Sequence, residues 1–174
     1  MNPDQVVDEF LARADLGAAQ SLIDIVESLR SAPYGRPSVR DPAFLIKEWR
    51  GTCTTKHALL ARAIQTLFPH LEPQVVHRVY RVTRDNAPSR AVHAVPPGGR
   101  NDVHRYLTVF MRGTRIPLDV TFPGPPWDGC SAMTLACGEG VDYPAAGDTD
   151  RQKANLEDRY CDSLVREPFI AALG

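Results

Sequence analysis

The sequence has little of what marks a nucleic-acid-binding or membrane-bound protein. Its net charge at neutral pH is −1, and only three of its 20 basic residues are lysines. This balance leaves no basic footprint for nucleic acid or for an anionic lipid surface. No apolar run approaches the roughly 18 residues that a transmembrane helix needs. The composition therefore predicts neither a nucleic-acid partner nor a membrane partner.

Cysteine is scarce, and its spacing does not suggest a metal. The chain has four cysteines, and none form a C-x-x-C pair: Cys53, Cys130, Cys137 and Cys161. Zinc and redox motifs typically use closer spacing, so we expect no metal. The first residues are acidic and lack the apolar core of a secretory signal. We therefore expect a cytoplasmic location, where thiols stay reduced, and inert roles for the last three cysteines.

The length of 174 residues fits one domain. A chain of this size buries about 70% of its unfolded surface, so its core needs no disulfide or metal staple. We divide the domain into N-terminal helices (1–47), a central core (48–123), and a loop with C-terminal helical material (124–174).

Helical patterning dominates the first part of the chain. Residues 4–14 and 18–31 are predicted as helices. The segment "DPAFLIKEW" (41–49) is predicted as a short helix, opened by Asp41 with Pro42 at its first position. A further helix begins after Gly51, with Thr52 or Thr54 as its cap, and ends at Pro69. Its apolar residues cover much of its circumference, so it is expected to be central: Ala58, Leu59, Leu60, Ala63, Ile64 and Leu67.

Strand patterning follows. Residues 73–83 are predicted as a strand, and "AVHAV" (91–95) as a short strand within a polar stretch. Residues 103–122 have the pattern of a β-hairpin that turns at "RGT" (112–114). The Pro, Gly and Asp content of residues 123–150 predicts loops, and the remaining residues are predicted to be helical. The order predicts an α+β fold in which helices pack on a small antiparallel sheet.

Cys53 stands where a loop is predicted to become a helix. Only the thiolate form of cysteine is a strong nucleophile, and the unpaired N–H groups and partial positive charge of a helix N-terminus stabilise that anion. Gly51 permits close approach of the backbone. The alternative interpretation is a buried small residue, since free cysteine is among the most buried residue types.

A cysteine nucleophile needs a base, and the base needs an orienting partner. The predicted hairpin supplies both, with His104 at the start of its first strand and Asp119 near the end of its second. Their positions are offset by about three residues, which a bulge or an asymmetric turn would absorb. Asp119 would then accept a hydrogen bond from one ring nitrogen and leave the other for Cys53.

These segments resemble the core of the transglutaminase-like superfamily. That family has G-x-C at the head of a helix, H-x-W/Y on one strand and D-x-T on the next. The corresponding residues here, in the same order and on the same predicted elements, are Gly51, Cys53, His104, Tyr106, Asp119 and Thr121. The match covers roughly residues 48 to 123. Tyr106 stands where tryptophan is commoner, and the "PGPPWDG" segment that follows matches no subgroup of known substrate.

The resemblance implies a papain-like core with Cys53 as nucleophile, His104 as general base and acid, and Asp119 as orienter. It implies acyl transfer from an amide- or peptide-containing substrate through a thioester, without a cofactor. The oxyanion donors would be the Cys53 backbone N–H and a second group. Trp49 is the candidate by position, and Tyr106 is also expected near the substrate.

Two other functions remain open at this point. Some members of the superfamily are inactive and bind a peptide or protein partner. An acyltransferase with a thioester donor, like the arylamine acetyltransferases, is a third possibility, but "RGTCTTKH" differs from their RGGxCxExN segment.

Other histidines compete with His104 for the role of base. His57 lies four residues after Cys53 on the same helix face, and His93 in "AVHAV" is a second alternative. His70 and His77 are predicted to be structural or surface residues, and Lys56 to be a solvated residue of the first helical turn. The "PPGG" segment lacks the spacing of a phosphate-binding loop.

Overall fold

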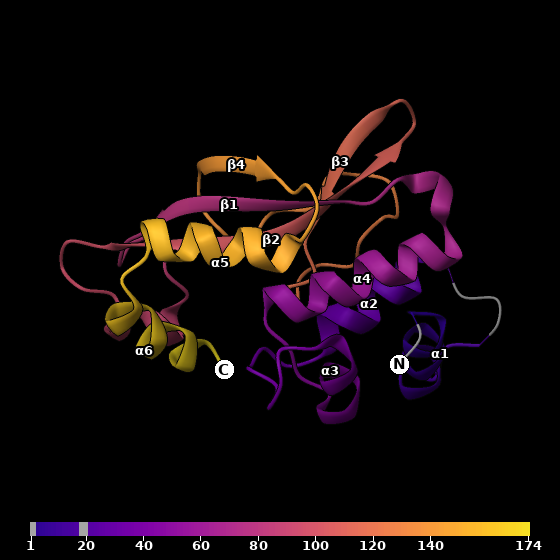
Figure 1. Cartoon of the computed structure of the whole chain (residues 1–174), viewed down its shortest axis with the longest axis horizontal. Coiled ribbons are helices and arrows are strands. Elements are labelled where there is room, and N and C mark those ends of the chain that lie inside the picture. Colours follow the sequence, from indigo (N-terminus) through magenta and orange to yellow (C-terminus); the bar gives the residue numbers. More distant parts are fainter. Residues whose placement is uncertain (1–2, 18–20) are drawn as a thin grey trace.

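The computed structural model describes residues 3–17 and 21–174 (Figure 1). Four α-helices come first: α1 (Pro3–Arg13), α2 (Leu22–Ser31), α3 (Pro42–Glu48) and α4 (Cys53–Leu67). The middle of the chain holds two 3₁₀ helices and four strands: η1 (Pro69–Leu71), β1 (Gln74–Val82), η2 (Ser89–Ala94), β2 (Arg100–Met111), β3 (Thr114–Leu118) and β4 (Gly140–Pro144). The chain ends with α5 (Thr149–Tyr160) and α6 (Ser163–Leu173).

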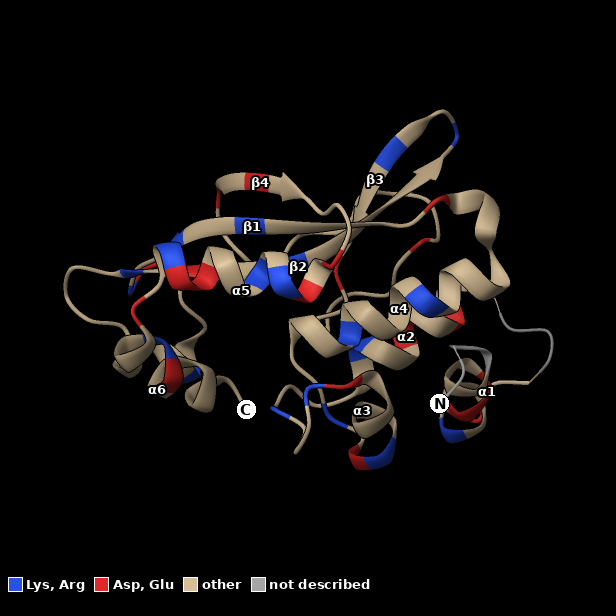
Figure 2. Ribbon diagram, in the orientation of Figure 1, with Lys and Arg blue, Asp and Glu red and all other residues tan. Residues whose placement is uncertain are grey.

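The four strands form one antiparallel sheet in the order β3-β2-β1-β4. Helices α4 and α5 both contact β2, and α1, α2 and α3 pack on α4. This confirms the predicted α+β class, with helices packed against a small antiparallel sheet. Figure 2 shows acidic and basic residues spread over the same elements, and α5 carries both signs. No helix in the described ranges combines the length and apolarity that a membrane span requires.

Local sequence signals account for the helix boundaries. Asp41 caps α3 by accepting from the Ala43 N–H at 2.8 Å, and Pro42 occupies its first turn. Thr52 is the N-cap of α4, and the Thr52 N–H donates to Thr55 Oγ1 at 3.1 Å. Helix α2 begins at Leu22, and the predicted start of this helix at residues 18–20 lies outside the described residues.

The β2–β3 turn falls where the sequence predicts it. Arg112 and Gly113 have φ values of 50° and 81°, the left-handed pair that a two-residue turn with the twist of a hairpin requires. Leu107 then pairs with Leu118 at the last step of the ladder. The residue after Leu118 is therefore free to leave the sheet.

Two predictions about the connecting segments were wrong. Residues 91–95 do not form a strand, because residues 89–94 turn into η2 and bury Ala91 against Phe169 and its neighbours. Residues 123–150 are not all loop, because Gly140–Pro144 pairs with β1 as an edge strand. Its residues are largely exposed, so this strand has no alternating apolar pattern that sequence reasoning could detect.

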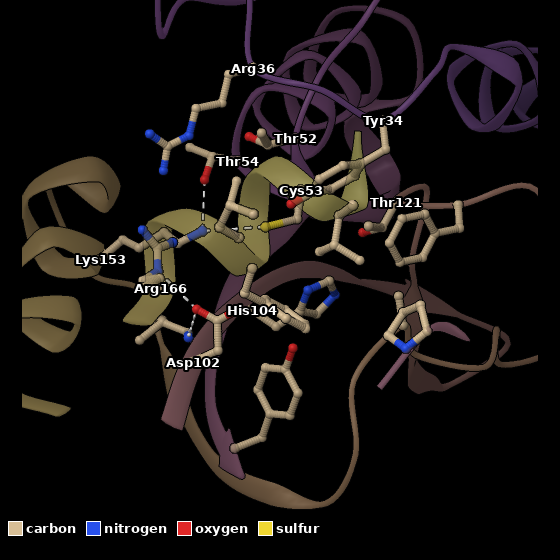
Figure 3. A pocket seen from close by; sticks show the side chains of 18 of the residues that line it. Tyr34, Arg36, Thr52, Cys53, Thr54, Asp102, His104, Thr121, Lys153 and Arg166 are labelled. Atoms are coloured by element: carbon tan, nitrogen blue, oxygen red, sulfur yellow. Dashed lines mark hydrogen bonds and ion pairs between the residues drawn. The ribbon is translucent and has the colours of Figure 1, made fainter. Parts of the chain in front are cut away.

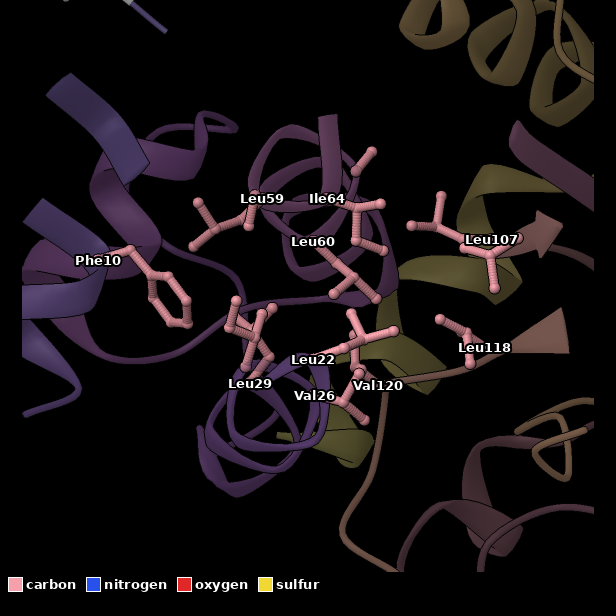
Figure 4. Packing of buried hydrophobic residues seen from close by; sticks show 14 of the residues in the cluster. Phe10, Leu22, Val26, Leu29, Leu59, Leu60, Ile64, Leu107, Leu118 and Val120 are labelled. Carbon is pink, nitrogen blue, oxygen red and sulfur yellow. The ribbon is translucent and has the colours of Figure 1, made fainter. Parts of the chain in front are cut away.

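Helix α4 lies at the centre of the main hydrophobic core, as its apolar circumference predicts. Figure 4 shows Leu59, Leu60 and Ile64 between residues of the N-terminal helices and residues of the sheet. A second apolar cluster, separate from this core, holds α6 against η2 and the end of β1: Tyr34, Val82, Ala91, Val95, Phe169, Ile170 and Leu173. Cys53 belongs to neither cluster.

Candidate active site

Cys53 is the first residue of α4, and 8% of the residue is exposed. The preceding turn is tight, because a Cβ on Gly51 would meet Leu45 Cδ1 at 2.5 Å and Thr55 Oγ1 at 2.8 Å. Only glycine fits at this close approach. The thiol thus faces the sheet from the N-terminal end of the helix, where the helix dipole favours an anion.

His104 and Asp119 meet beside this cysteine. The imidazole Nε2 lies 2.7 Å from Asp119 Oδ2, and both side chains are almost fully buried. Asp119 comes directly after the end of β3, so its side chain can reach back toward β2 although the two residues are offset in register. The predicted offset of about three residues between His104 and Asp119 along the hairpin is therefore accommodated without a bulge. Asp119 also accepts hydrogen bonds from the Thr121 N–H at 2.9 Å and from the Ala136 N–H at 2.7 Å.

The hydrogen bonds and charges around His104 favour its charged form. Burial lowers the pKa of His104, but the adjacent Asp119 carboxylate and then Cys53 outweigh burial and hold this pKa well above its ordinary value. For Asp119, burial raises the pKa, and the charge and hydrogen bond of His104 hold it far below the ordinary value of an aspartate. His104 and Asp119 therefore form an ion pair, with ring Nδ1 left for the thiol.

The same groups make Cys53 acidic. Burial raises the pKa of its thiol, but the Lys153 charge and then His104 lower it to about 5. A free thiol has a pKa of about 8.5. At neutral pH the pair Cys53–His104 is thus a thiolate beside an imidazolium, the reactive form of cysteine. Figure 3 shows the two side chains next to each other in the cavity.

Lys153 is the residue of the site that sequence reasoning missed. Its Nζ lies 3.3 Å from Cys53 Sγ and 2.7 Å from Thr54 Oγ1, and only 1% of the residue is exposed. It comes from α5, 100 positions away in the sequence. The surrounding segment, "RQKANLEDRY", is mostly polar and contains no motif. The only available signal was the rarity of lysine in the chain.

Replacing Lys153 with methionine should raise the pKa of Cys53 toward that of a free thiol, because the variant removes the main positive charge beside the sulfur while keeping an unbranched side chain of similar length. The rate of iodoacetamide labelling against pH measures this pKa. Lys47→Met is the matched control, since Lys47 is exposed on α3. An unchanged midpoint in the Lys153 variant would contradict this role.

His57 is not placed to act as the base. Its Nε2 accepts a hydrogen bond from the Val120 N–H at 3.0 Å, so Nδ1 carries the proton and donates it to the Cys53 carbonyl at 2.7 Å. Burial lowers the pKa of His57 to about 4. Both ring nitrogens are occupied, and the neutral ring ties the first turn of α4 to the segment that follows Asp119.

Two further buried cations hold the framework. Lys56 was predicted to be solvated, but it is fully buried and donates to the Ala32 and Thr121 carbonyls at 2.5 and 3.0 Å. Burial lowers its pKa to about 8. Arg105 donates to His77 Nε2 at 3.1 Å and to Asp150 Oδ1 at 2.5 Å, which joins β2, β1 and α5 behind Cys53. His77 is therefore structural, as predicted.

The remaining candidates lie away from the thiol. Trp49 ends α3 in a left-handed conformation and stacks with Phe10. It is not among the residues that line the cavity, so the structure does not bring it to Cys53 as an oxyanion donor. Tyr106 stacks on the His104 ring with centroids 6.4 Å apart, and it supports the imidazole from outside the cavity. His93 on η2 and His70 on η1 are exposed.

The cavity beside Cys53 is small and well covered. It offers about 40 Å³ of space to water-sized groups, room for roughly three water molecules. Residues of α6 (Phe169, Ile170 and Leu173) and the Tyr34 and Phe122 side chains line it together with Cys53 and His104. An amide substrate therefore reaches the sulfur only when some of these covering side chains move.

The described residues contain no group of three or more His, Cys, Asp or Glu side chains arranged to hold a metal ion. Cys130, Cys137 and Cys161 are free thiols. Burial raises the pKa of Cys137 and Cys161, to about 11 for the latter. Both are therefore protonated at neutral pH, in contrast to Cys53.

Comparison with known proteins adds no assignment. No protein-family model matches the chain, and no curated protein is significantly similar to it.

Proposed function

We propose that this chain is a cysteine-dependent acyl-transfer enzyme with a papain-like, transglutaminase-like core, acting on amide bonds in the cytoplasm. The observation that supports this most directly is the arrangement of three side chains. Cys53 lies at a helix N-terminus with His104 beside it, and Asp119 lies 2.7 Å from His104 Nε2. Their order along the chain and the elements that carry them agree with the resemblance noted in the sequence.

The geometry suggests a two-step reaction. The Cys53 thiolate attacks the carbonyl carbon of an amide, and the His104 imidazolium gives its proton to the leaving amine as the carbon–nitrogen bond breaks. The neutral ring then takes a proton from water or from a second amine, which attacks the thioester and releases Cys53. Asp119 holds the ring and stabilises its charged form. The Cys53 N–H at the start of α4 would be one donor to the developing oxyanion.

The covered cavity favours a second candidate, an inactive module that binds a peptide or protein partner. Such a module has no need for an acidic, paired thiol. The low pKa of Cys53 and the Asp119–His104 ion pair therefore favour the enzyme.

The proposal predicts an acyl-enzyme with a simple activated ester. Incubation with p-nitrophenyl acetate should release p-nitrophenolate and leave one acetyl group on Cys53, detectable by intact mass and peptide mapping after acid quench. Cys137→Ser should acylate normally, because that thiol is protonated at neutral pH. Absence of both enzyme-dependent p-nitrophenolate release and an acetyl group on Cys53, or equal acetylation of all cysteines, would contradict the proposal.

A further inference from the structure

The wall of the cavity beside Cys53 carries an excess of positive charge. Its lining contains the cations Arg36, Arg40, Lys153 and Arg166 and the carboxylate Asp102. The charge of His104, which also lines the cavity, is balanced by its ion pair with Asp119. In the view of Figure 3, Arg36, Lys153 and Arg166 lie on one side of Cys53, and Tyr34 and Thr121 lie on the other. The site is therefore two-sided, with a cationic wall and a mainly uncharged wall.

The neighbouring carboxylates do not balance these cations. Arg166 contacts Asp102 at 2.9 Å and Glu157 at 2.8 Å. The same two carboxylates also serve Arg100, at 3.3 Å from Asp102, and Lys153, at 3.7 Å from Glu157. Arg166 also lies 3.8 Å from Glu167, so these three cations share Asp102, Glu157 and part of Glu167, which is itself paired with Arg36.

The outer part of the wall repeats this imbalance. Arg36 forms an ion pair with Glu167 at 2.6 Å. The hydrogen bond and charge of Arg36, then the charges of Arg166 and Arg40, lower the pKa of Glu167 although burial raises it. Both arginines are exposed at the rim, so they can reorient toward a bound molecule.

The Cys53 thiolate supplies one of the missing negative charges in the resting protein, at 3.3 Å from the Lys153 ammonium. Acylation removes that charge, because a thioester is neutral. Among the described residues, Thr54 Oγ1 and the shared Glu157 then remain as partners of the almost fully buried Lys153. Loss of the closest anion beside a buried charge is costly, so a negative group arriving with the acyl donor would stabilise the acylated state.

We infer that the acyl donor carries a carboxylate close to the carbonyl that Cys53 attacks, and that Lys153 and the rim arginines receive it. This inference rests on the proposed function, since it names the substrate class for the same site. The uncharged wall formed by Tyr34, Phe122 and Thr121 would face the remainder of the acyl group.

Two small alkylating reagents test this without knowledge of the substrate. Iodoacetate and iodoacetamide have nearly the same shape and both form a carbon–sulfur bond with loss of iodide, but only iodoacetate carries a carboxylate. The ratio of their rate constants on Cys53 is independent of the thiolate fraction, because both reagents attack the same thiolate. It therefore separates attraction of the anion from any change in the pKa of the thiol.

The ratio of the iodoacetate rate to the iodoacetamide rate should exceed that of glutathione in the same buffer. It should fall on the order of threefold in Lys153→Met and by a smaller factor in Arg40→Gln, as expected for loss of one charge several ångströms away in a partly hydrated site. Added salt should also reduce it. Arg112→Gln is the control, since Arg112 lies in the distant β2–β3 turn.

The exposed Arg40 keeps the test valid if the buried Lys153 variant does not fold. A ratio that is unchanged in both variants would overturn the inference, even if it is high in the natural protein, because the His104 imidazolium alone attracts anions. Rapid labelling by iodoacetamide with no preference for iodoacetate would overturn the substrate class but leave the proposed function standing. Failure of both reagents to label Cys53 faster than glutathione would remove the proposed function and the inference together.

Discussion

Replacing Cys53 with alanine should lower the acyl-transfer rate by at least about a thousandfold, since the nucleophile forms the covalent intermediate and loss of one member of such a group removes most of its effect. The measurement is p-nitrophenolate release from p-nitrophenyl acetate under single-turnover conditions. The secondary structure should persist, because the Cys53 side chain belongs to neither apolar cluster.

Cys137→Ala is the matched control for this loss, as it removes a partly buried thiol close to the site. It should retain nearly full activity. A Cys53→Ala protein with the same circular dichroism as the natural chain and the same rate would contradict the assigned nucleophile. Some loss of thermal stability is expected in Cys53→Ala, because Lys153 loses the anion at 3.3 Å.

Replacing Asp119 with alanine should destabilise the fold by about 3–5 kcal/mol, the usual cost of removing one partner from a buried ion pair. The variant leaves the His104 ring and the Thr121 and Ala136 N–H groups without their common acceptor. Urea unfolding at neutral pH measures the change. Activity should fall together with stability, since the ring loses its orientation and its charge partner.

Asp119→Asn separates these two effects because it keeps the shape of the side chain. Both oxygens of Asp119 accept hydrogen bonds, so the amide nitrogen of asparagine must face a donor in either orientation. We expect a smaller loss of stability than for alanine, with acyl transfer still reduced on the order of a hundredfold or more. An Asn variant with unchanged kinetics would contradict the role of Asp119.

The pKa of Asp119 also gives a pH dependence of stability. Its pKa is lower in the folded protein than in the unfolded chain, so its contribution is fully present above the unfolded value of about 3.9 and is lost as the pH falls toward the folded value. The Asp119→Asn variant should therefore lose less stability than the natural protein between pH 4 and pH 2, in urea titrations at each pH.

The elements that carry the triad were predictable because their signals are local. Gly51, the N-cap Thr52 and the apolar stripe of α4 all lie within one short segment of the sequence. The hairpin turn depends on Arg112 and Gly113. Because it fixes how β2 and β3 pair, it also brings His104 near Asp119. Each of these contacts follows from short-range patterns in the chain.

The rest of the site depends on contacts between distant segments. Lys153 reaches Cys53 from a polar helix, and only the packing of α5 on β2 brings it there. The cover formed by α6 depends on apolar contacts with Tyr34 and η2, which no periodicity encodes. Lys56 was mispredicted for the same reason: its carbonyl partners come from other parts of the chain, and a lysine in a first helical turn is ordinarily solvated.

The most direct test of the account is the rate at which iodoacetamide alkylates Cys53 from pH 4 to pH 10, in the natural protein and in His104→Ala. The account predicts a midpoint near pH 5 in the natural protein, well below the ~8.5 of a free thiol, and a clear rise in the His104 variant. Slow labelling with an ordinary or raised midpoint in both proteins would contradict it. Cys53 would then be a packed core residue, and the partner-binding module would replace the enzyme as the best account of this chain.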